Sequence, residues 1–192
     1  MVEIILASAS PRRWELLKQI GLSFTVQVSN VEENEFKGDN PQKWVEQLAK
    51  DKASSVASSL KQGLVIGADT VVFKDGKILG KPKSECEAYD MLSFLSGAEH
   101  QVLTGIAIID AMSGESYIDS EITRVKFRQL TEQEINAYIA TGEPFDKAGA
   151  YGIQGLGALL VESITGCYFN VVGLPLQKLA QGLKRFGVEV LK

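Results

Sequence analysis

The first candidate for chemistry is a serine- and arginine-rich segment, Ser8-Ala9-Ser10-Pro11-Arg12-Arg13. Serine followed by proline is typical of a helix start. Arginines in a first helical turn oppose the helix dipole, at a cost of about 0.3–1 kcal/mol each, and a bound anion would reverse that sign. The segment therefore predicts a phosphate cradle made of backbone N–H groups, the Ser8 and Ser10 hydroxyls, Arg12 and Arg13. The alternative is a capped surface helix with two solvated arginines.

Lys52 is the second candidate, because it interrupts an apolar stripe. A helix is expected from Asn40-Pro41 to about Leu60, and Lys52 lies between the apolar residues Leu48 and Val56 on one face of it. Its ammonium group must either snorkel to solvent or find a partner, such as a phosphate or a carboxylate.

Asp69 is the third candidate, between the apolar runs Leu64–Ile66 and Val71–Phe73. We expect the chain to leave the strand at residues 67–70. A carboxylate is costly to bury unless it is paired, binds a metal or opens into a cleft. Asp69 is therefore a candidate metal ligand or general base, and an Asx turn that ends a strand is the alternative.

Weaker signals accompany these three. Glu32-Glu33 could hold a divalent cation or form a solvated acidic loop, and Gly80-Lys81-Pro82 places Lys81 on a stiffened turn. The glycine-rich segment 146–157, with Lys147 and Gln154, could wrap a small ligand or form a flexible loop. His100, the only histidine, lies beside an apolar strand and is expected to be structural.

Composition excludes several classes of protein. The net charge is −4, from 20 basic and 24 acidic residues, which argues against a broad electrostatic grip on nucleic acid or an anionic membrane. No apolar run reaches the roughly 18 residues of a membrane span, and no basic leader precedes the first apolar run. The two cysteines lack CxxC spacing, which favours a reduced, cytoplasmic environment and excludes a structural zinc site.

Strand and helix signals alternate along the chain, which we treat as a single domain over residues 1–192. A hairpin signal at Asp75-Gly76 breaks this alternation, so the fold class is α/β with a mixed sheet. Capping boxes at Ser84/Glu87 and Thr131/Glu134 predict two helix starts. Residues 158–161 are expected to form a strand, and the last helix should follow Pro175.

Taken together, the motifs resemble those of the Maf family of nucleoside triphosphate pyrophosphatases, in the same order. The matching segments are Leu6–Arg13, Glu32-Glu33, Lys50–Ala53, Gly67–Val72, Gly80–Pro82, Leu95–Gly97, His100–Thr104, Thr141–Pro144, Asp146–Gly157 and Gly166–Pro175. The resemblance covers nearly the whole chain. It implies a two-lobed fold, similar to that of inosine triphosphate pyrophosphatases, in which helices flank an elongated mixed sheet with a central cleft.

The resemblance also implies a reaction, namely hydrolysis between the α- and β-phosphates of a nucleoside triphosphate. A divalent cation, Mg²⁺ or Mn²⁺, would be held by Glu33 and Asp69, and a homodimer is conceivable. Asp69 matches the family's proton acceptor and acts with Lys52 and Lys81 in the expected catalytic group. Arg13 and Lys147 add further positive charge for the phosphates.

The most detailed expectation concerns the substrate. Arg12, Thr70 and Gln154 match the family's specificity positions, and the Gln154-bearing loop is similar to that of the dTTP/UTP branch. Two alternatives stay open. The base could be a modified purine, as in 7-methyl-GTP, or the protein could be a non-catalytic regulator of septum formation.

Overall fold

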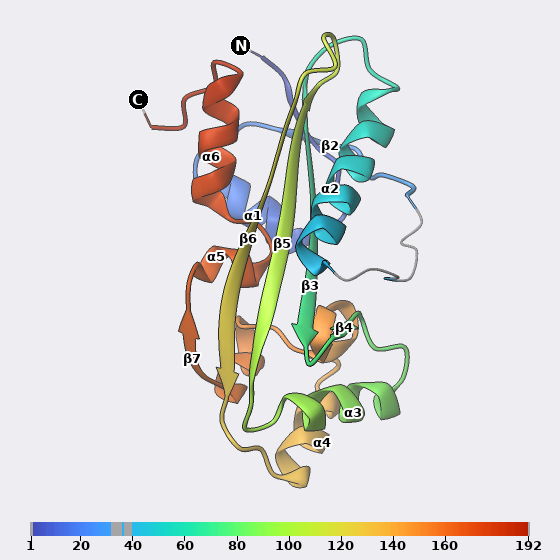
Figure 1. Cartoon of the computed structure of the whole chain (residues 1–192), viewed down its shortest axis with the longest axis vertical. Coiled ribbons are helices and arrows are strands. Elements are labelled where there is room, and N and C mark those ends of the chain that lie inside the picture. The colour runs from blue at the N-terminus through green and yellow to red at the C-terminus, as the bar shows by residue number, and fades with distance from the viewer. Residues whose placement is uncertain (1, 32–35, 37–39, 192) are drawn as a thin grey trace. The chain divides into compact units, whose positions relative to one another are not determined.

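The computed structural model describes residues 2–31, 36 and 40–191. Within them lies a seven-stranded mixed sheet whose order is β2-β1-β3-β5-β6-β7, with β4 paired to β3 (Figure 1). β1 runs parallel to β2 and to β3, whereas β4 and β7 run antiparallel to their neighbours β3 and β6. The strands are β1 (Ile4–Leu6), β2 (Thr25–Val26), β3 (Leu64–Lys74), β4 (Lys77–Leu79), β5 (Glu99–Asp110), β6 (Ser116–Phe127) and β7 (Val161–Thr165). The expected α/β class with a mixed sheet is confirmed.

The helices start largely where local signals place them. The Asn40 side chain accepts a hydrogen bond from the backbone of Lys43, and Thr131 and Glu134 form a complete capping box. The α-helices are α1 (Pro11–Gln19), α2 (Pro41–Ala57), α3 (Glu85–Leu95), α4 (Glu132–Ala140), α5 (Tyr168–Val172) and α6 (Leu176–Arg185), and short 3₁₀ helices are η1 (Glu143–Asp146), η2 (Ala148–Ala150) and η3 (Gly155–Leu160). Over the described residues, none of the helices has the length and apolar character that a membrane span requires.

The chain divides into two compact units, and each long strand β3, β5 and β6 contributes to both. The first unit comprises Met1–Asp69, Thr104–Glu121 and Gly173–Lys192, and the second comprises Thr70–Leu103 and Ile122–Val172. Each unit therefore has its own set of helices.

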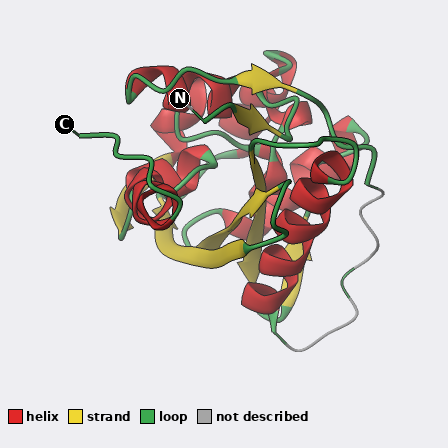
Figure 2. Ribbon diagram, turned by 90° about the horizontal axis from the view of Figure 1, so that it is seen from above, coloured by secondary structure: helices red, strands yellow, loops and turns green. Residues whose placement is uncertain are grey.

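In the first unit, helices lie on both sides of the strands, as Figures 1 and 2 show for α2 and α6. The α2 side is a small-residue core contributed by α2, β1, β3 and β5, made of Ile5, Ala7, Ala49, Ala53, Val56, Ala57, Val65, Ala107 and Ile109. A Cβ at Gly67 of β3 would lie 2.2 Å from the Ala49 carbonyl oxygen, so only glycine allows the α2 backbone to approach this closely. On the other side, Lys178 of α6 pairs with Asp119 of β6 at 3.0 Å.

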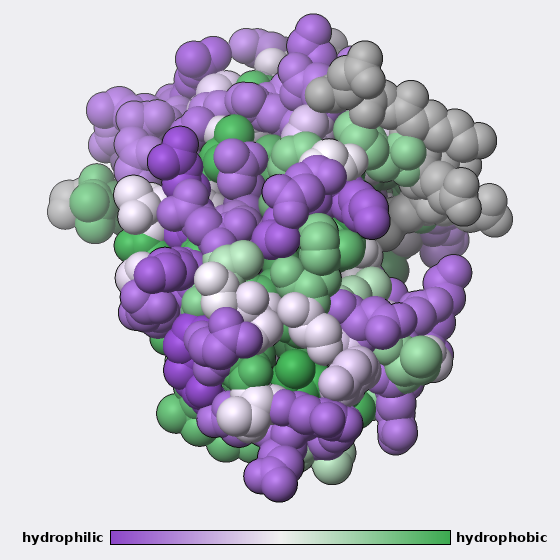
Figure 3. Space-filling view, turned by 60° about the horizontal axis from the view of Figure 1, so that its bottom comes forward, coloured by the Kyte–Doolittle hydropathy of each residue, from purple (hydrophilic) through white to green (hydrophobic). Residues whose placement is uncertain are grey.

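The second unit has a larger, partly aromatic core. Its buried residues come from α3, α4, the ends of the long strands and the segment after η2, and they include Val72, Leu92, Leu95, Phe127, Ile135, Tyr138, Tyr151 and Leu160. The face drawn in Figure 3 mixes hydrophilic and apolar side chains. Phe145, Leu156 and Leu159 are large apolar residues of this unit that remain exposed.

Two element predictions were wrong, and one helix was not predicted. β3 runs without interruption through residues 67–70, because the small residues Gly67 and Ala68 let the strand continue beneath α2. Residues 158–160 belong to the 3₁₀ helix η3, and the strand begins only at Val161. The short helix α5 was not anticipated, since its five residues carry no clear periodic pattern.

Candidate active site

Lys52 and Asp69 form an ion pair between α2 and β3. The Lys52 ammonium donates a hydrogen bond to Oδ1 of Asp69, and the two side chains are only 12% and 8% exposed. Lys52 therefore has a carboxylate partner and does not snorkel to solvent. Asp69 lies inside a strand, so the Asx-turn alternative is wrong.

The close approach at Gly67 helps to position this pair. Ala53 directly follows Lys52 and is fully buried against the sheet, whereas Asp69 follows two positions after Gly67 on the strand. Because the backbones of α2 and β3 meet at Gly67, a long lysine side chain reaches the strand carboxylate from the helix. The ion pair thus depends on contacts between elements far apart in sequence.

The Ser8–Arg13 segment leaves the sheet beside Asp69. β1 is parallel to β3, with Leu6 opposite Ile66, and the Ala7 amide donates to the Ile66 carbonyl at 2.8 Å. Ser8 follows directly after β1 and is buried. In open α/β sheets, ligands bind beyond the carboxyl ends of parallel strands, which is where this segment lies.

Hydrogen bonds fix the conformation of this segment. Ser8 Oγ accepts from the Ser10 amide at 3.2 Å and from Nη1 of Arg13 at 3.1 Å, and Nε of Arg13 donates to the Gly173 carbonyl at 2.9 Å. Ser10 occupies the N-cap position of α1, but its side chain makes no capping hydrogen bond. The solvated-arginine alternative is therefore wrong for Arg13. Arg12 lies in the same first turn and is half-buried.

Four further predicted residues, Thr70, Lys81, Lys147 and Gln154, belong to the second unit. Thr70 follows Asp69 on β3 and is half-buried, whereas Lys81 and Gln154 are exposed. Lys147 donates from Nζ to the Glu143 carbonyl at 2.6 Å and to Oδ1 of Asp146 at 2.7 Å. These residues lie on irregular segments, except for Thr70.

Glu143 was missed as a contact residue of the glycine-rich loop. Its carboxylate accepts hydrogen bonds from the backbone amides of Leu156 and Gly157, at 3.0 and 3.1 Å. The sequence marks Glu143 only as a charged residue between Gly142 and Pro144 and carries no signal for these contacts.

Glu33 lies outside the described residues. Among the residues that are described, no group of three or more His, Cys, Asp or Glu side chains could hold a metal ion.

His100 is structural, as expected. It is 2% exposed, and its Nε2 lies 2.7 Å from the Tyr151 hydroxyl. Burial, reinforced by the nearby Lys74 charge, lowers the pKa of His100 to about 4. The imidazole is therefore neutral at neutral pH and packs edge-on against Phe127 and Tyr151.

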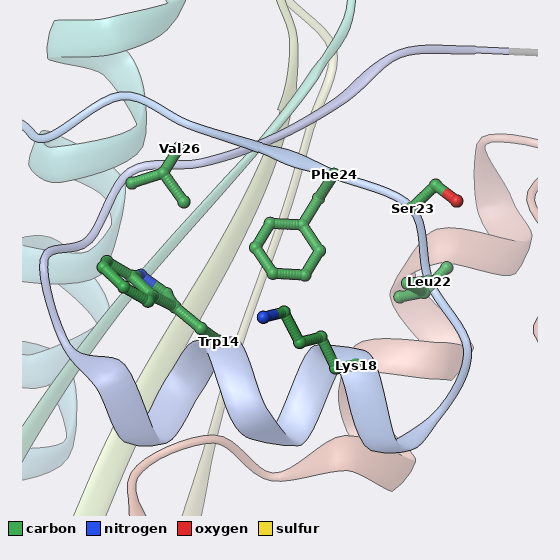
Figure 4. A pocket seen from close by; sticks show the side chains of 6 residues that line it. All are labelled: Trp14, Lys18, Leu22, Ser23, Phe24 and Val26. Atoms are coloured by element: carbon green, nitrogen blue, oxygen red, sulfur yellow. The ribbon is translucent and has the colours of Figure 1, made fainter.

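A separate hollow lies beside α1 in the first unit, with a volume of about 460 Å³ (Figure 4). Its lining includes Trp14, Phe24 and Val26, and the Lys18 side chain extends toward the two aromatic rings. Among the described residues, none of the predicted site residues lines it. Nε1 of Trp14 donates to the Ser8 carbonyl at 3.1 Å, so the hollow and the Ser8 segment share the start of α1.

Comparisons with known proteins identify the family and similar relatives. The family described as Maf-like protein matches residues 3–186. The chain is 53% identical to a dTTP/UTP pyrophosphatase of Desulforamulus reducens, with all of both chains covered. It is 53% identical to one of Moorella thermoacetica, covering 99% of this chain and 98% of the relative, and 52% identical to one of Clostridioides difficile, covering 96% and 95%.

Proposed function

This chain belongs to the Maf family, and we propose that it hydrolyses dTTP and UTP to nucleoside monophosphate and pyrophosphate. Water attacks the α-phosphorus, the bond from that phosphorus to the α,β-bridging oxygen breaks, and pyrophosphate leaves. The observation that carries the proposal is the buried Lys52–Asp69 pair beside the Ser8–Arg13 segment. A carboxylate for the water and cations for the phosphates are what this reaction requires.

Asp69 is the proposed proton acceptor. The ion pair with Lys52 holds its carboxylate in place on a strand, and a base must be fixed within hydrogen-bonding reach of the water that it deprotonates. Lys52 also supplies positive charge beside the base, which favours the negative charge that develops on the phosphate oxygens. The water proton passes to the Asp69 carboxylate as the new P–O bond forms.

Phosphate binding is assigned to Ser8, Ser10, Arg12 and Arg13, with Lys81 and Lys147 as further cations. The Arg13 guanidinium is anchored through Nε to a backbone carbonyl and through Nη1 to Ser8. Anchoring reduces the conformational entropy lost on binding, and guanidinium groups match the geometry of phosphate oxygens. The N–H groups at the start of α1 add to this anion site.

A divalent cation, Mg²⁺ or Mn²⁺, is the proposed cofactor. Asp69 and Glu33 would hold it, and when bound it would neutralise phosphate charge. The carboxylate of Asp69 is an oxygen donor of the type that both ions prefer.

Base recognition is assigned to Gln154, with Arg12 and Thr70. A glutamine amide carries both a donor and an acceptor, and it can pair with the O4 acceptor and N3–H donor of thymine or uracil. Cytosine presents the opposite pattern, so a fixed amide would disfavour it by about 1–3 kcal/mol. We further propose that the enzyme acts in the cytoplasm on nucleotide pools, and a homodimer stays a prediction.

The test is pyrophosphate release from dTTP, UTP, CTP, GTP and 7-methyl-GTP, with and without Mg²⁺ or Mn²⁺. We expect dTTP and UTP to have the highest kcat/KM and CTP a value about 10- to 100-fold lower. Activity should require the metal. Equal rates with GTP or 7-methyl-GTP would contradict the pyrimidine assignment. Nucleotide binding without pyrophosphate release would favour the regulator.

A further inference from the structure

Glu143 joins two segments of the second unit that carry proposed substrate residues. Through its main-chain carbonyl it accepts the Lys147 ammonium at 2.6 Å. Through its carboxylate it accepts hydrogen bonds from the amides of Leu156 and Gly157, two and three positions after Gln154. One residue at the start of η1 therefore contacts both segments.

The carboxylate of Glu143 has a third partner. The Tyr138 hydroxyl, on α4, donates to Oε1 at 2.9 Å and accepts from the Gly152 amide at 3.3 Å. Tyr138 is 5% exposed and belongs to the core of the second unit. The loop is thus fastened before Gln154, at Gly152, and after it, at residues 156 and 157.

Ionisation of Glu143 is consistent with this role. Burial raises the pKa of Glu143, but hydrogen bonds from two backbone amides and the Tyr138 hydroxyl outweigh it, so the pKa lies below its ordinary value. Hydrogen bonds to a charged acceptor are about twice as strong as those between neutral groups. The carboxylate is therefore an acceptor only, suited to several N–H and O–H donors at once.

Close packing leaves the loop little room for other conformations. A Cβ at Gly157 would lie 2.1 Å from the Gly152 carbonyl oxygen and 2.7 Å from the Tyr138 hydroxyl. The two ends of the Gln154 segment therefore touch each other and the same tyrosine. A short segment fastened at both ends holds its side chains in a narrow range of orientations.

We propose that Glu143 is the positioning residue for Gln154 and thereby sets the preference for thymine and uracil over cytosine. This inference rests on the proposed function. A freely rotating amide could turn over to match cytosine, so discrimination by Gln154 requires a fixed loop. Glu143 does not contact the reacting atoms; its carboxylate acts through the backbone that carries Gln154.

The main test compares Glu143→Gln with the parent in kcat/KM for dTTP and CTP. Glutamine keeps the size of the side chain but replaces one acceptor oxygen by an NH₂ group, which faces donors. We expect the dTTP/CTP ratio to fall about tenfold, through KM more than kcat. Tyr138→Phe, which removes only one of the three donors, should lower the ratio less. Glu162→Gln is the matched control, because Glu162 pairs with Lys126 of β6 in the same unit, and the ratio should not change.

A double variant separates positioning from an independent effect. If Glu143 acts through Gln154, then Glu143→Gln/Gln154→Ala has the same dTTP/CTP ratio as Gln154→Ala alone. A ratio in Glu143→Gln equal to that of the parent would overturn the proposal, and so would effects of the two substitutions that simply add.

Hydrogen exchange gives a readout that does not depend on turnover. The Leu156 and Gly157 amides should exchange about tenfold faster or more in Glu143→Gln, and at the parent rate in Glu162→Gln. Unchanged exchange would overturn the positioning role even in an active enzyme. A parent that released no pyrophosphate from dTTP or UTP would instead overturn the proposed function, and the selectivity claim with it.

Discussion

The two units hold their proposed site residues in different ways. In the first, Lys52 and Asp69 lie on a helix and a strand and are buried as an ion pair. In the second, Lys147 and Gln154 lie on irregular segments fastened by hydrogen bonds to Glu143. A base and its partner need fixed geometry, which regular elements provide, whereas loops can change without loss of the fold. The proposed base Asp69 and its partner Lys52 are therefore held by regular elements, whereas the base-reading Gln154 is held by a fastened loop.

Replacing the carboxylate of Asp69 should have the largest effect on activity. Asp69→Asn keeps the shape of the side chain and removes its basicity and charge. We expect kcat to fall about a thousandfold for every nucleotide alike, as for loss of a general base, while the protein remains folded. Asp75→Asn is the control, since its carboxylate is 71% exposed and lies in the β3–β4 turn. Near-normal turnover by Asp69→Asn would remove Asp69 from the mechanism.

Acid should affect the second unit through His100. Its pKa in the folded protein is about 4, below the ordinary value of 6.5, so the unfolded chain takes up the proton first as the pH falls. The contribution of neutral His100 to the free energy of unfolding is fully present above about pH 6.5 and decreases progressively toward pH 4. The loss amounts to about 3 kcal/mol, because each pKa unit corresponds to about 1.4 kcal/mol. Urea unfolding from pH 7 to pH 4 measures this loss. In His100→Gln, the free energy of unfolding should depend less steeply on pH. An equally steep dependence would show that other groups cause the acid sensitivity.

The close contact at Gly67 offers a smaller test, confined to the first unit. Gly67→Ala would place a Cβ 2.2 Å from the Ala49 carbonyl oxygen, so α2 must shift on the sheet. We expect a loss of about 1–3 kcal/mol in the free energy of unfolding, together with reduced turnover because Lys52 moves with the helix. A Cβ at Gly80 would meet no atom within 4 Å, and Gly80→Ala should unfold like the parent. Equal stability of both variants would contradict the packing argument.

Local signals predicted much of the fold. The capping box of Thr131 and Glu134 and the Asn40-Pro41 helix start depend on residues a few positions apart, and both helices begin where expected. The strand over residues 64–74 was wrongly divided, because an aspartate within an apolar run is compatible with a turn until its partner is known. That partner is Lys52 on α2, and their pairing depends on packing at Gly67.

The types of residue at the site could be predicted from the sequence better than the contacts that they make. Lys52 in an apolar stripe required a partner, but either a ligand or a carboxylate satisfied that requirement. The apolar run at residues 158–161 looks like a strand; instead, residues 155–160 form η3, whose first amides bind the Glu143 carboxylate. No local pattern reveals that contact, since donor and acceptor are 13 positions apart.

The assignment of Lys52 to the phosphates and of Gln154 to the base is tested most directly by kcat/KM for dTTP and CTP in the parent, Lys52→Met and Gln154→Ala. Lys52→Met should lower both values together by a decade or more and leave their ratio unchanged, because Lys52 serves the phosphates that both nucleotides share. Gln154→Ala should lower the dTTP/CTP ratio about tenfold through the value for dTTP. A changed ratio in Lys52→Met, or an unchanged ratio in Gln154→Ala, would contradict the account.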